Sequence, residues 1–343
     1  MDISVIICTY NRGESLRNVL DDLVGQEAES GLSYEIVIVD NNSGDSTRSV
    51  CEEYLALKPG LFRYLLEPRQ GKTFALNSGI KTSRGNIIAF TDDDVCIDSR
   101  WLLSIKEAFT LYPDCKAFGG RVLPLWPDLV PSWIAREGAF RNIGGTIVAH
   151  DYGEEVKSYS SPGMWPPIGA NMFFAKEIFR KYGYFNEGLD FAATKIPMLE
   201  DTEFCNRLLK GKEAMLYLPA PLVYHPVCEE RLTKKYFRKH AFKSGRAQYL
   251  VGSLQRNSRY VLFERQKNDR RLYNIPLYFF KNVLSCLVKG VVAACMQNPR
   301  KSFYFEKLLV YYMGTMYELF RQRKTAPGKA DTFAVSKAPN VTM

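Results

Sequence analysis

The first hundred residues alternate between short apolar runs and longer amphipathic stretches, and this alternation is the strongest constraint on the fold. The apolar runs read ISVIICTY, YEIVIVDN, FRYLLEP and NIIAFTD. Stretches with helical periodicity, such as SLRNVLDDLVGQ and TFALNSGIKTS, separate them. Strands that alternate with helices in this way form βαβ units with right-handed crossovers and a sheet covered on both faces. We therefore predict an α/β protein with a doubly wound, mostly parallel sheet flanked by helices.

Polar residues follow three of the predicted strands. The first strand ends in residues 9–12, the second in residues 40–42 and the fourth in residues 92–94. Ligands of open α/β sheets bind at the carboxyl ends of the strands, so we expect these segments to line one site. The sequence has no Gly-x-Gly-x-x-Gly fingerprint and no complete P-loop, which disfavours a dinucleotide-binding protein and a P-loop NTPase.

Asp92, Asp93 and Asp94 place three carboxylates directly after an apolar run. Such carboxylates repel one another unless positive charge lies among them. A hard divalent cation prefers carboxylate oxygens and normally uses one or two of them from the protein. We predict a cation site here, with an acidic turn followed by Asp98 as a helix cap as the alternative.

A second acidic centre, MLEDTEF, contains Glu200, Asp201 and Glu203. The acidic first turn and the basic end of EDTEFCNRLLKGK suit a helix dipole, so a purely structural helix start is one reading. The other is catalytic: neighbouring carboxylates make it costly to ionise both, which raises the pKa of one of them toward the range of a general base. Both readings stay open on these residues alone.

Charge is divided unequally along the chain. Residues 231–343 hold 23 Lys and Arg against 5 Asp and Glu, a net charge of +18, whereas residues 1–230 hold 23 against 32, a net charge of −9. Such a basic part is typical of a surface that faces a polyanion, either nucleic acid or an anionic membrane, and a solvated basic face is the alternative.

The basic part contains the apolar segment IPLYFFKNVLSCLVKGVVAAC. Lys281 and Lys289 interrupt it, and lysines are costly inside a membrane. We therefore predict a helix that lies in a membrane interface or packs on the protein, and not one that spans the bilayer. Basic residues beside such a helix are attracted to anionic lipids.

The start of the chain and its cysteines indicate the compartment. The segment MDISVIICTYN lacks a basic leader region and predicts a strand, not a signal peptide. The eight cysteines contain no Cys-x-x-Cys pair, which favours a reducing environment. We expect a cytoplasmic protein, peripheral on the inner face of the cell membrane.

Six motifs, in their order along residues 2–226, resemble those of family 2 glycosyltransferases with the GT-A fold. They are SVIICTYNR, IVIVDNNSGDST, GKTFALNSGI, IIAFTDDD, GANMFF and LEDTEF. The resemblance implies an inverting, metal-dependent enzyme that moves a sugar from a UDP- or GDP-linked donor to a glycan or lipid-linked acceptor. It also implies that Asp201 is the general base, with Glu200 beside it.

The same resemblance implies roles for the remaining candidate residues. Asp94 and Asp92, with His225, would bind Mn²⁺ or Mg²⁺ that bridges the diphosphate, and an imidazole ligand suits Mn²⁺ better. The nucleotide sugar is assigned to Thr9, Tyr10, Asn11, Arg12, Asp40, Asn42, Lys72, Asn77, Asp92 and Asp93. The acceptor pocket is assigned to Trp165, Gly169, Ala170 and Asn171.

For several of these residues a purely structural or solvent-exposed role is the alternative. Asp40 either recognises the base or caps a helix that begins near Ser43. Lys72 either lies near phosphate at a helix entrance or is merely solvated. His225 is either a ligand or structural, and Trp165 either stacks on sugar or anchors a loop.

We predict a catalytic domain over residues 1–228, with a nucleotide-binding half (1–118) and an acceptor and catalytic half (119–228). The second half is rich in Pro, Gly and Trp, which is typical of a binding surface. A basic helical extension over 229–324, in contact with the membrane, and a disordered tail over 325–343 follow.

Two other functions stay open. One is a catalytically inactive module that binds sugar or nucleotide, which the intact Asp94 and Asp201 disfavour. The other is a nucleic-acid-binding protein that uses the basic C-terminal part. That function leaves both acidic centres unexplained, so we do not expect nucleic acid as a partner.

Overall fold

The computed structural model describes residues 1–27, 31–189, 200–254, 271–272 and 275–325, which belong to two compact units. The first unit comprises Met1–Arg136 and Ile143–Tyr236, and the second comprises Glu137–Asn142 and the chain from Phe237 onward. The predicted domain boundary at residue 228 therefore lies within the first unit. Beyond Thr325, the predicted tail lies outside the described residues.

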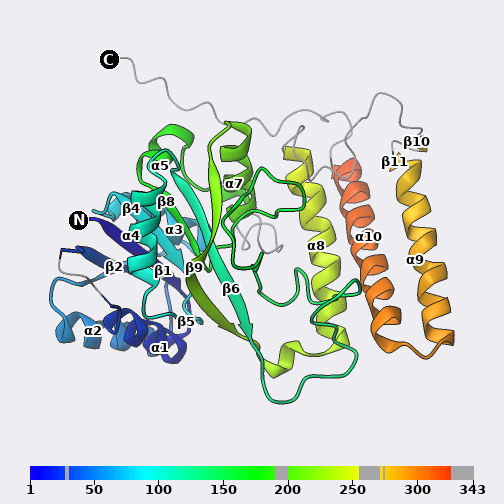
Figure 1. Cartoon of the computed structure of the whole chain (residues 1–343), viewed down its shortest axis with the longest axis horizontal. Coiled ribbons are helices and arrows are strands. Elements are labelled where there is room, and N and C mark those ends of the chain that lie inside the picture. The colour runs from blue at the N-terminus through cyan, green and yellow to red at the C-terminus, as the bar shows by residue number, and fades with distance from the viewer. Residues whose placement is uncertain (28–30, 190–199, 255–270, 273–274, 326–343) are drawn as a thin grey trace. The chain divides into compact units, whose positions relative to one another are not determined.

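The first unit is built on one nine-stranded sheet with the order β3-β2-β1-β4-β8-β6-β9-β5, in which β7 also pairs with β9 (Figure 1). Its strands are β1 (Ile3–Thr9), β2 (Tyr34–Asp40), β3 (Phe62–Leu66), β4 (Ile87–Thr91), β5 (Cys96–Ile97), β6 (Ala117–Leu125), β7 (Lys157–Ser158), β8 (Met172–Ala175) and β9 (Met215–Pro226).

Long parallel ladders join β3, β2, β1 and β4, and another joins β6 to β9. The antiparallel ladders of β8 with β4 and β6, and of β9 with β5 and β7, are shorter. The mixed, mostly parallel sheet that the sequence predicts is thus confirmed.

Alternate residues of the strands point to opposite faces, and each face carries its own hydrophobic core. Val5 and Ile7 of β1 pack with the apolar sides of three helices on one face, and Ile6 packs with three others on the opposite face. The first set is α1 (Gly13–Val24), α2 (Thr47–Leu57) and α4 (Trp101–Leu111), and the second is α3 (Lys72–Thr82), α5 (Glu177–Tyr182) and α7 (Glu200–Lys210). Short 3₁₀ turns span Glu187–Leu189 and Glu229–Arg231.

A break in the register of β6 against β9, between Gly120 and Arg121, is held by Asn171. The Asn171 amide donates to the carbonyls of Arg121 at 2.8 Å and Pro221 at 2.9 Å, and its oxygen accepts from the Trp101 indole at 2.9 Å. These bonds satisfy backbone groups that the broken ladder leaves unpaired. Asn171 therefore fixes the half of the sheet that carries His225.

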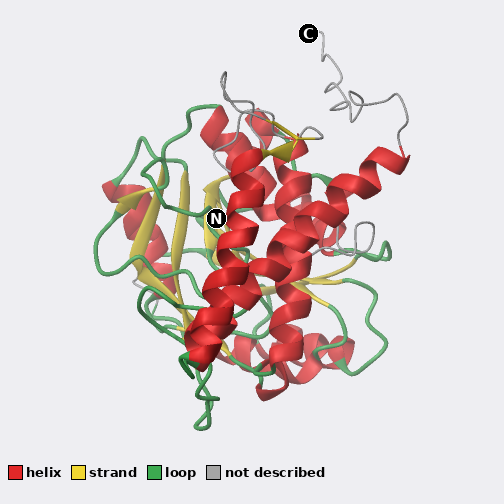
Figure 2. Ribbon diagram, turned by 90° about the vertical axis from the view of Figure 1, so that its right-hand side faces the viewer, coloured by secondary structure: helices red, strands yellow, loops and turns green. Residues whose placement is uncertain are grey.

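The second unit contains three long helices, with α10 (Pro299–Thr325) between α8 (Lys234–Leu254) and α9 (Leu277–Cys295) (Figures 1 and 2). A short hairpin of β10 (Arg271–Leu272) and β11 (Ile275–Pro276) precedes α9. Glycines Gly245 and Gly314 let the backbones of α8 and α10 touch, because a Cβ at either one would overlap a carbonyl oxygen of the other helix. The predicted helical extension is present.

Candidate active site

The loops after β1, β2 and β4 meet at one edge of the sheet, because β1 pairs in parallel with both neighbours. Arg12, from the first loop, reaches the aspartates after β4. Its Nη1 donates to Asp93 Oδ1 at 2.9 Å and lies 2.6 Å from Asp94 Oδ2. The predicted crowding of negative charge is therefore relieved in part by an arginine of the protein itself.

Lys72 provides a second cation to the same cluster. Its Nζ lies 2.7 Å from Asp92 Oδ1, and water screens this pair because the Lys72 side chain is 42% exposed. Protein atoms packed around the ammonium remove part of its hydration and would alone lower the pKa of Lys72, but the carboxylates of Asp92 and Glu200 outweigh this effect and raise that pKa. Burial alone would raise the pKa of Asp92, but Lys72 outweighs it and the pKa is lowered. Both groups are thus charged at neutral pH.

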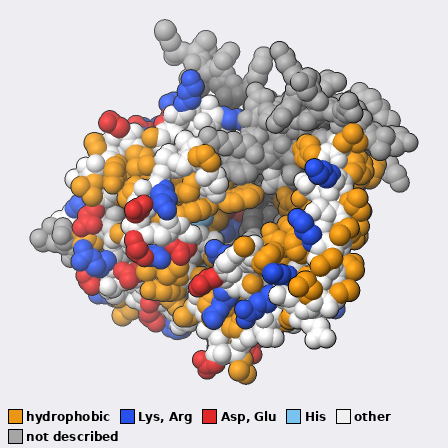
Figure 3. Space-filling model, turned by 45° about the vertical axis from the view of Figure 1, so that its right-hand side comes forward, with side chains coloured by type: hydrophobic (Ala, Val, Ile, Leu, Met, Phe, Trp, Pro, Cys, Tyr) orange, Lys and Arg blue, Asp and Glu red, His pale blue; other side chains and the backbone are white. Residues whose placement is uncertain are grey.

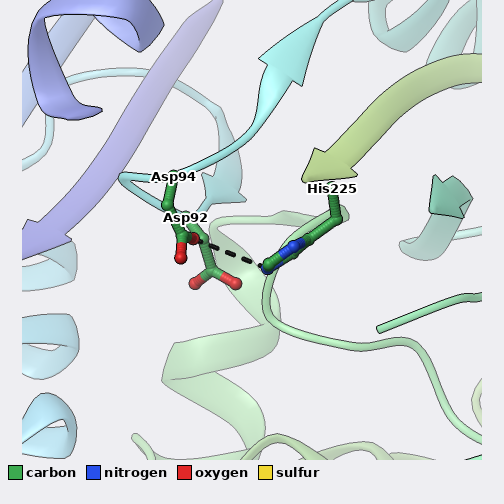
Figure 4. Close-up of side chains that lie close together, drawn as sticks. All are labelled: Asp92, Asp94 and His225. Atoms are coloured by element: carbon green, nitrogen blue, oxygen red, sulfur yellow. Dashed lines mark ion pairs between the residues drawn. The ribbon is translucent and has the colours of Figure 1, made fainter. Parts of the chain in front are cut away.

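Asp92, Asp94 and His225 converge, with one ligand atom of each within 4.8 Å of the others (Figure 4). The aspartates follow β4, whereas His225 lies near the end of β9. The His225 Nε2 atom is 3.5 Å from Asp94 Oδ1, while Arg12 contacts the other carboxylate oxygen. Asp94 therefore keeps one oxygen turned toward the imidazole.

The orientation of the His225 ring follows from its surroundings. The side chain is buried, and Nδ1 lies 3.0 Å from the carbonyl oxygen of Pro226. A carbonyl only accepts hydrogen bonds, so Nδ1 is the nitrogen that donates to Pro226, and Nε2 is the ring nitrogen turned toward the aspartates. Metal-binding histidines are held in this way. Two carboxylates and one imidazole suit Mn²⁺ better than Mg²⁺, so these residues fit a divalent cation.

Asp201 lies in the first turn of α7, and its carboxylate is buried. Its Oδ2 accepts the N–H of Gly169 at 3.1 Å, and its Oδ1 accepts the N–H of Thr202 at 2.6 Å. Burial raises the pKa of Asp201, although Lys72 and the two N–H groups act in the opposite direction. The carboxylate is therefore oriented by the backbone and has more affinity for a proton than an ordinary aspartate.

Lys72 also lies between the two acidic centres, the aspartates after β4 and Asp201 of α7. A Cβ built at Gly169 would lie 3.4 Å from Lys72 Nζ and 3.9 Å from Asp201 Oδ2. Glycine at this position thus leaves the space between the ammonium and the carboxylate free of a side chain. The half-buried Glu200 contributes to the negative field at Lys72.

Asp40 is buried, and both of its oxygens have donors in the protein. Oδ1 accepts the Ser43 N–H at 2.8 Å, and Oδ2 accepts the Tyr64 hydroxyl at 2.8 Å. The contact with Ser43 is cap-like, although α2 begins only at Thr47. Asn42, beside it, is exposed and has a positive φ of 65°.

The other predicted residues of the first loop differ in exposure. Thr9 is buried, whereas Tyr10 is half exposed and Asn11 is exposed with a positive φ of 53°. The side-chain oxygen Oδ1 of Asn11 accepts the Gly44 N–H at 2.7 Å, and the backbone N–H of Asn11 donates to Ser43 Oγ at 2.9 Å. Asn11 therefore ties the first loop to the second.

The side-chain amides of Asn77 and Asn171 are used in hydrogen bonds outside this cluster. Asn77 is buried, and its amide exchanges two 3.0 Å hydrogen bonds with the main chain of Phe185. Asn171 uses its whole amide at the break in the sheet described above. Ala170 is buried, and its carbonyl accepts from Thr91, while Trp165 is 56% exposed.

Asn41 organises the entry to α3, and no separate pattern in the sequence singles it out. Its amide donates to the carbonyls of Glu67 at 3.1 Å and Arg69 at 2.7 Å, and its oxygen accepts the Gly71 N–H at 2.8 Å. Asn41 thereby holds the loop that delivers Lys72. Its only signal was a place in the polar turn after β2, which it shares with its neighbours.

Solved sugar-transferring enzymes share this fold. The mannosyltransferase PcManGT from Pyrobaculum calidifontis, solved in complex with GDP-Man and Mn²⁺, has a TM-score of 0.58 and 14% identity, with 92% of this chain and 87% of that chain covered. TarS 1-349 from S. aureus, solved with UDP-GlcNAc, has a TM-score of 0.52 and 15% identity, with 94% and 92% covered. These likenesses confirm the GT-A fold.

Curated relatives are similar over most of the chain. A glucosyl-dolichyl phosphate glucuronosyltransferase of Haloferax volcanii is 21% identical over 313 residues, which are 89% of this chain and 93% of the relative. The succinoglycan biosynthesis protein ExoM of Rhizobium meliloti is 24% identical over 280 residues, 81% and 80% respectively.

The curated relatives and the match to a family model together show that the protein is a glycosyltransferase. The family model described as Glycosyl transferase family 2 matches residues 4–183, which is more than half of the chain. The protein belongs to glycosyl transferase family 2, and the predicted family and enzyme class are confirmed.

Proposed function

We propose that this glycosyltransferase is an inverting, cation-dependent enzyme that transfers a sugar from a UDP- or GDP-linked donor to a glycan or lipid-linked acceptor. The observation that carries the proposal is the position of Lys72, which pairs with Asp92 and faces Asp201 across Gly169. Sugar transfer requires charge control at the departing diphosphate and at the acceptor hydroxyl. Lys72 lies between Asp92, which is suited to the diphosphate side of the reaction, and Asp201, which is suited to deprotonate the acceptor hydroxyl.

The donor would lie at the carboxyl ends of the strands. PcManGT was solved with GDP-Man and TarS with UDP-GlcNAc, which supports a nucleotide-linked sugar for this chain. Asp94, Asp92 and His225 would hold Mn²⁺ or Mg²⁺, which neutralises negative charge on a departing diphosphate. The nucleotide would contact the first two loops, where Tyr10 and Asn42 are exposed.

Asp201 would act as the general base. The acceptor hydroxyl gives its proton to the Asp201 carboxylate while its oxygen forms the new bond to the anomeric carbon. The bond between that carbon and the diphosphate oxygen breaks, and the electron pair leaves with the nucleoside diphosphate. Attack from the face opposite the diphosphate inverts the anomeric centre. The N–H groups of Gly169 and Thr202 hold the carboxylate in place, and Lys72 favours its ionised form.

The acceptor would be a saccharide on or near a membrane lipid. The Haloferax volcanii relative is named for a dolichyl phosphate, which supports a lipid-linked acceptor. The exposed Trp165 ring would offer a surface for a sugar. With a net charge of +18 beyond residue 230, we propose peripheral contact with an anionic membrane, on its inner, cytoplasmic face. Membership of a glycosyltransferase family favours the proposed sugar transfer over the two other functions, a nucleic-acid-binding protein and a catalytically inactive module.

A screen of nucleotide sugars with Mn²⁺ tests the proposal, with release of nucleoside diphosphate and thermal shift as readouts. A bound donor stabilises the folded protein, by about 2.7 kcal/mol at a hundredfold excess over its dissociation constant. We expect one UDP- or GDP-linked donor to give both signals in the wild type and neither in Asp94→Ala. Asp114→Ala, an exposed aspartate that follows α4, serves as the control. Transfer that is equal with Mn²⁺ and with a chelator would refute cation dependence.

A further inference from the structure

The helix α9 has two unlike faces. Its buried residues Phe279, Cys286 and Ala293 recur every seven positions and so form one stripe. Phe279 packs on α10, with its ring centroid 5.1 Å from that of Tyr312. Farther along, a Cβ at Gly290 would lie 3.5 Å from Phe305 Cβ. The helix α9 therefore rests on α10 along its length.

The opposite face of α9 is apolar and exposed. Among the described residues, α9 is the one helix long and apolar enough to span a membrane, yet only 17% of its apolar window is buried. The large side chains of this face are between 43% and 63% exposed. They are Leu277, Leu284, Leu287, Val288, Val291 and Val292. Figure 3 shows hydrophobic side chains gathered along this helix with basic side chains among them. Exposed apolar side chains gathered on one face mark an interaction surface.

The charged residues of α9 and of the segments on either side of it are of one sign. Residues 270–305 contain six Lys and Arg and no Asp or Glu. Lys281 and Lys289 of α9 are exposed, and the Lys289 ammonium lies 5.9 Å from the centre of the Phe305 ring. Lysine stems of this kind lie along apolar surface while the ammonium stays in water. A second copy of the same face would set lysines against lysines, so charge complementarity favours an anionic partner.

We propose that the exposed face of α9 is the surface by which the protein binds an anionic lipid bilayer, with the helix parallel to the membrane plane. The inference rests on the membrane contact proposed above and assigns that contact to one face of one helix. Leu284, Val288 and Val291 enter the acyl boundary, and Lys281 and Lys289 meet the phosphate groups at its edge.

The charges of the neighbouring helix α10 indicate whether α9 lies in the membrane plane or spans the bilayer. A spanning α9 would carry α10 into the hydrocarbon, because the two helices pack together along α9. The helix α10 carries Glu306, Lys307 and the fully buried Glu318, which pairs with Arg246 of α8 at 2.8 Å. Charges are expensive at that depth, so the in-plane orientation is favoured.

Flotation of the full chain with phosphatidylglycerol and phosphatidylcholine vesicles tests the face. The wild type should bind the anionic vesicles, and binding should fall steeply with salt. Leu284→Ser with Val291→Ser should lower the partition constant by about tenfold or more. Leu57→Ser with Leu111→Ser changes two equally exposed leucines of α2 and α4 and should leave binding unchanged.

A charge variant separates the two contributions. Lys281→Gln with Lys289→Gln should lower partition into anionic vesicles by about thirtyfold, since each lysine contributes about fivefold, and should leave partition into neutral vesicles unaffected. Lys58→Gln with Lys212→Gln, two exposed lysines of the first unit, is the control.

Three outcomes would overturn the proposal. A wild type that ignores anionic vesicles refutes the membrane contact itself. Unchanged binding by the double serine variant refutes the assignment to α9. A dimer in light scattering that the double serine variant abolishes shows that a second copy covers the face instead. Donor-dependent nucleoside diphosphate release, measured on the same samples with a soluble acceptor, distinguishes these failures from failure of the catalytic proposal.

Discussion

Asp201→Asn changes the proposed base while keeping the size of the side chain. A positioned general base contributes roughly 10² to 10⁴-fold to the rate, so turnover should fall by that factor. This corresponds to about 3–5 kcal/mol of activation free energy. Donor affinity should stay near that of the wild type, because the contacts of Asp201 in the protein are to the Gly169 and Thr202 N–H groups and not to the cation-site residues.

The same contacts give a cost in stability. Both Asp201 oxygens accept a backbone N–H, whereas asparagine has one oxygen and one NH₂ group, so one N–H must face a donor. A lost buried hydrogen bond costs about 1–3 kcal/mol. For a unit of this size the midpoint of thermal unfolding should fall by roughly 2–12 °C.

Asp2→Asn is the matched control. Asp2 Oδ2 accepts the Ser33 N–H at 2.9 Å at the start of β1, the end of the strand remote from the site. This variant should keep its turnover and lose little stability, because only Oδ2 accepts hydrogen bonds from Ser33 and the single oxygen of asparagine can replace it. Single-turnover transfer, calorimetric donor titration and thermal unfolding would be measured on both variants. An Asp201→Asn enzyme that remains folded and turns over within a few-fold of the wild type would refute the assignment of the base, and lost donor affinity would make Asp201 a pocket residue.

His225→Gln should weaken Mn²⁺ binding roughly tenfold or more in calorimetry, whereas His240→Gln in α8 should not; equal affinities would remove the imidazole from the cation site. Because burial raises the pKa of Asp201, the acid limb of the kcat/KM profile should lie above the range of an ordinary aspartate. Lys72→Met should move that limb to still higher pH, since loss of the cation disfavours the ionised carboxylate, and a shift to lower pH would contradict this reasoning. Gly245→Ala should destabilise the helical unit by about 1–3 kcal/mol in urea unfolding, because its Cβ would overlap the Tyr311 carbonyl oxygen. Gly290→Ala, whose Cβ meets Phe305 only at 3.5 Å, should be neutral or stabilising.

The four N-terminal strands and the edge at which the site lies follow from local sequence. Each apolar run and the polar residues after it are contiguous, so the parallel arrangement alone places residues 9–12, 40–42 and 92–94 together. The helix start at Glu200 and the long strand that carries His225 also follow from patterns of a few residues.

Side-chain direction is what the local pattern leaves open. Asn77 and Asn171 lie in motifs beside other candidate residues, yet their amides are used by Phe185 and by the broken ladder of β6 and β9. Arg12 was assigned to the nucleotide, whereas its guanidinium lies on Asp93 and Asp94. The contacts of Arg12 join segments that are more than eighty residues apart in the sequence. Only the tertiary packing determines which partners these side chains have.

For α9, too, the local sequence predicts the helix, whereas tertiary packing determines which of its faces is exposed. Composition predicts an apolar helix with two lysines, but its packing on α10 decides which side chains are covered. The seven-residue recurrence of Phe279, Cys286 and Ala293 becomes meaningful only once the partner helix is known.

Calorimetric titration of UDP and GDP, with Mn²⁺ and with a chelator, measures the cation site without knowledge of the sugar or the acceptor. We expect the wild type to bind one of the two nucleotides at least tenfold more tightly with Mn²⁺. Asp94→Ala should remain folded and bind that nucleotide equally weakly under both conditions. If the wild type binds nucleotide equally well with Mn²⁺ and with the chelator, Asp92, Asp94 and His225 do not form a cation site that serves the donor.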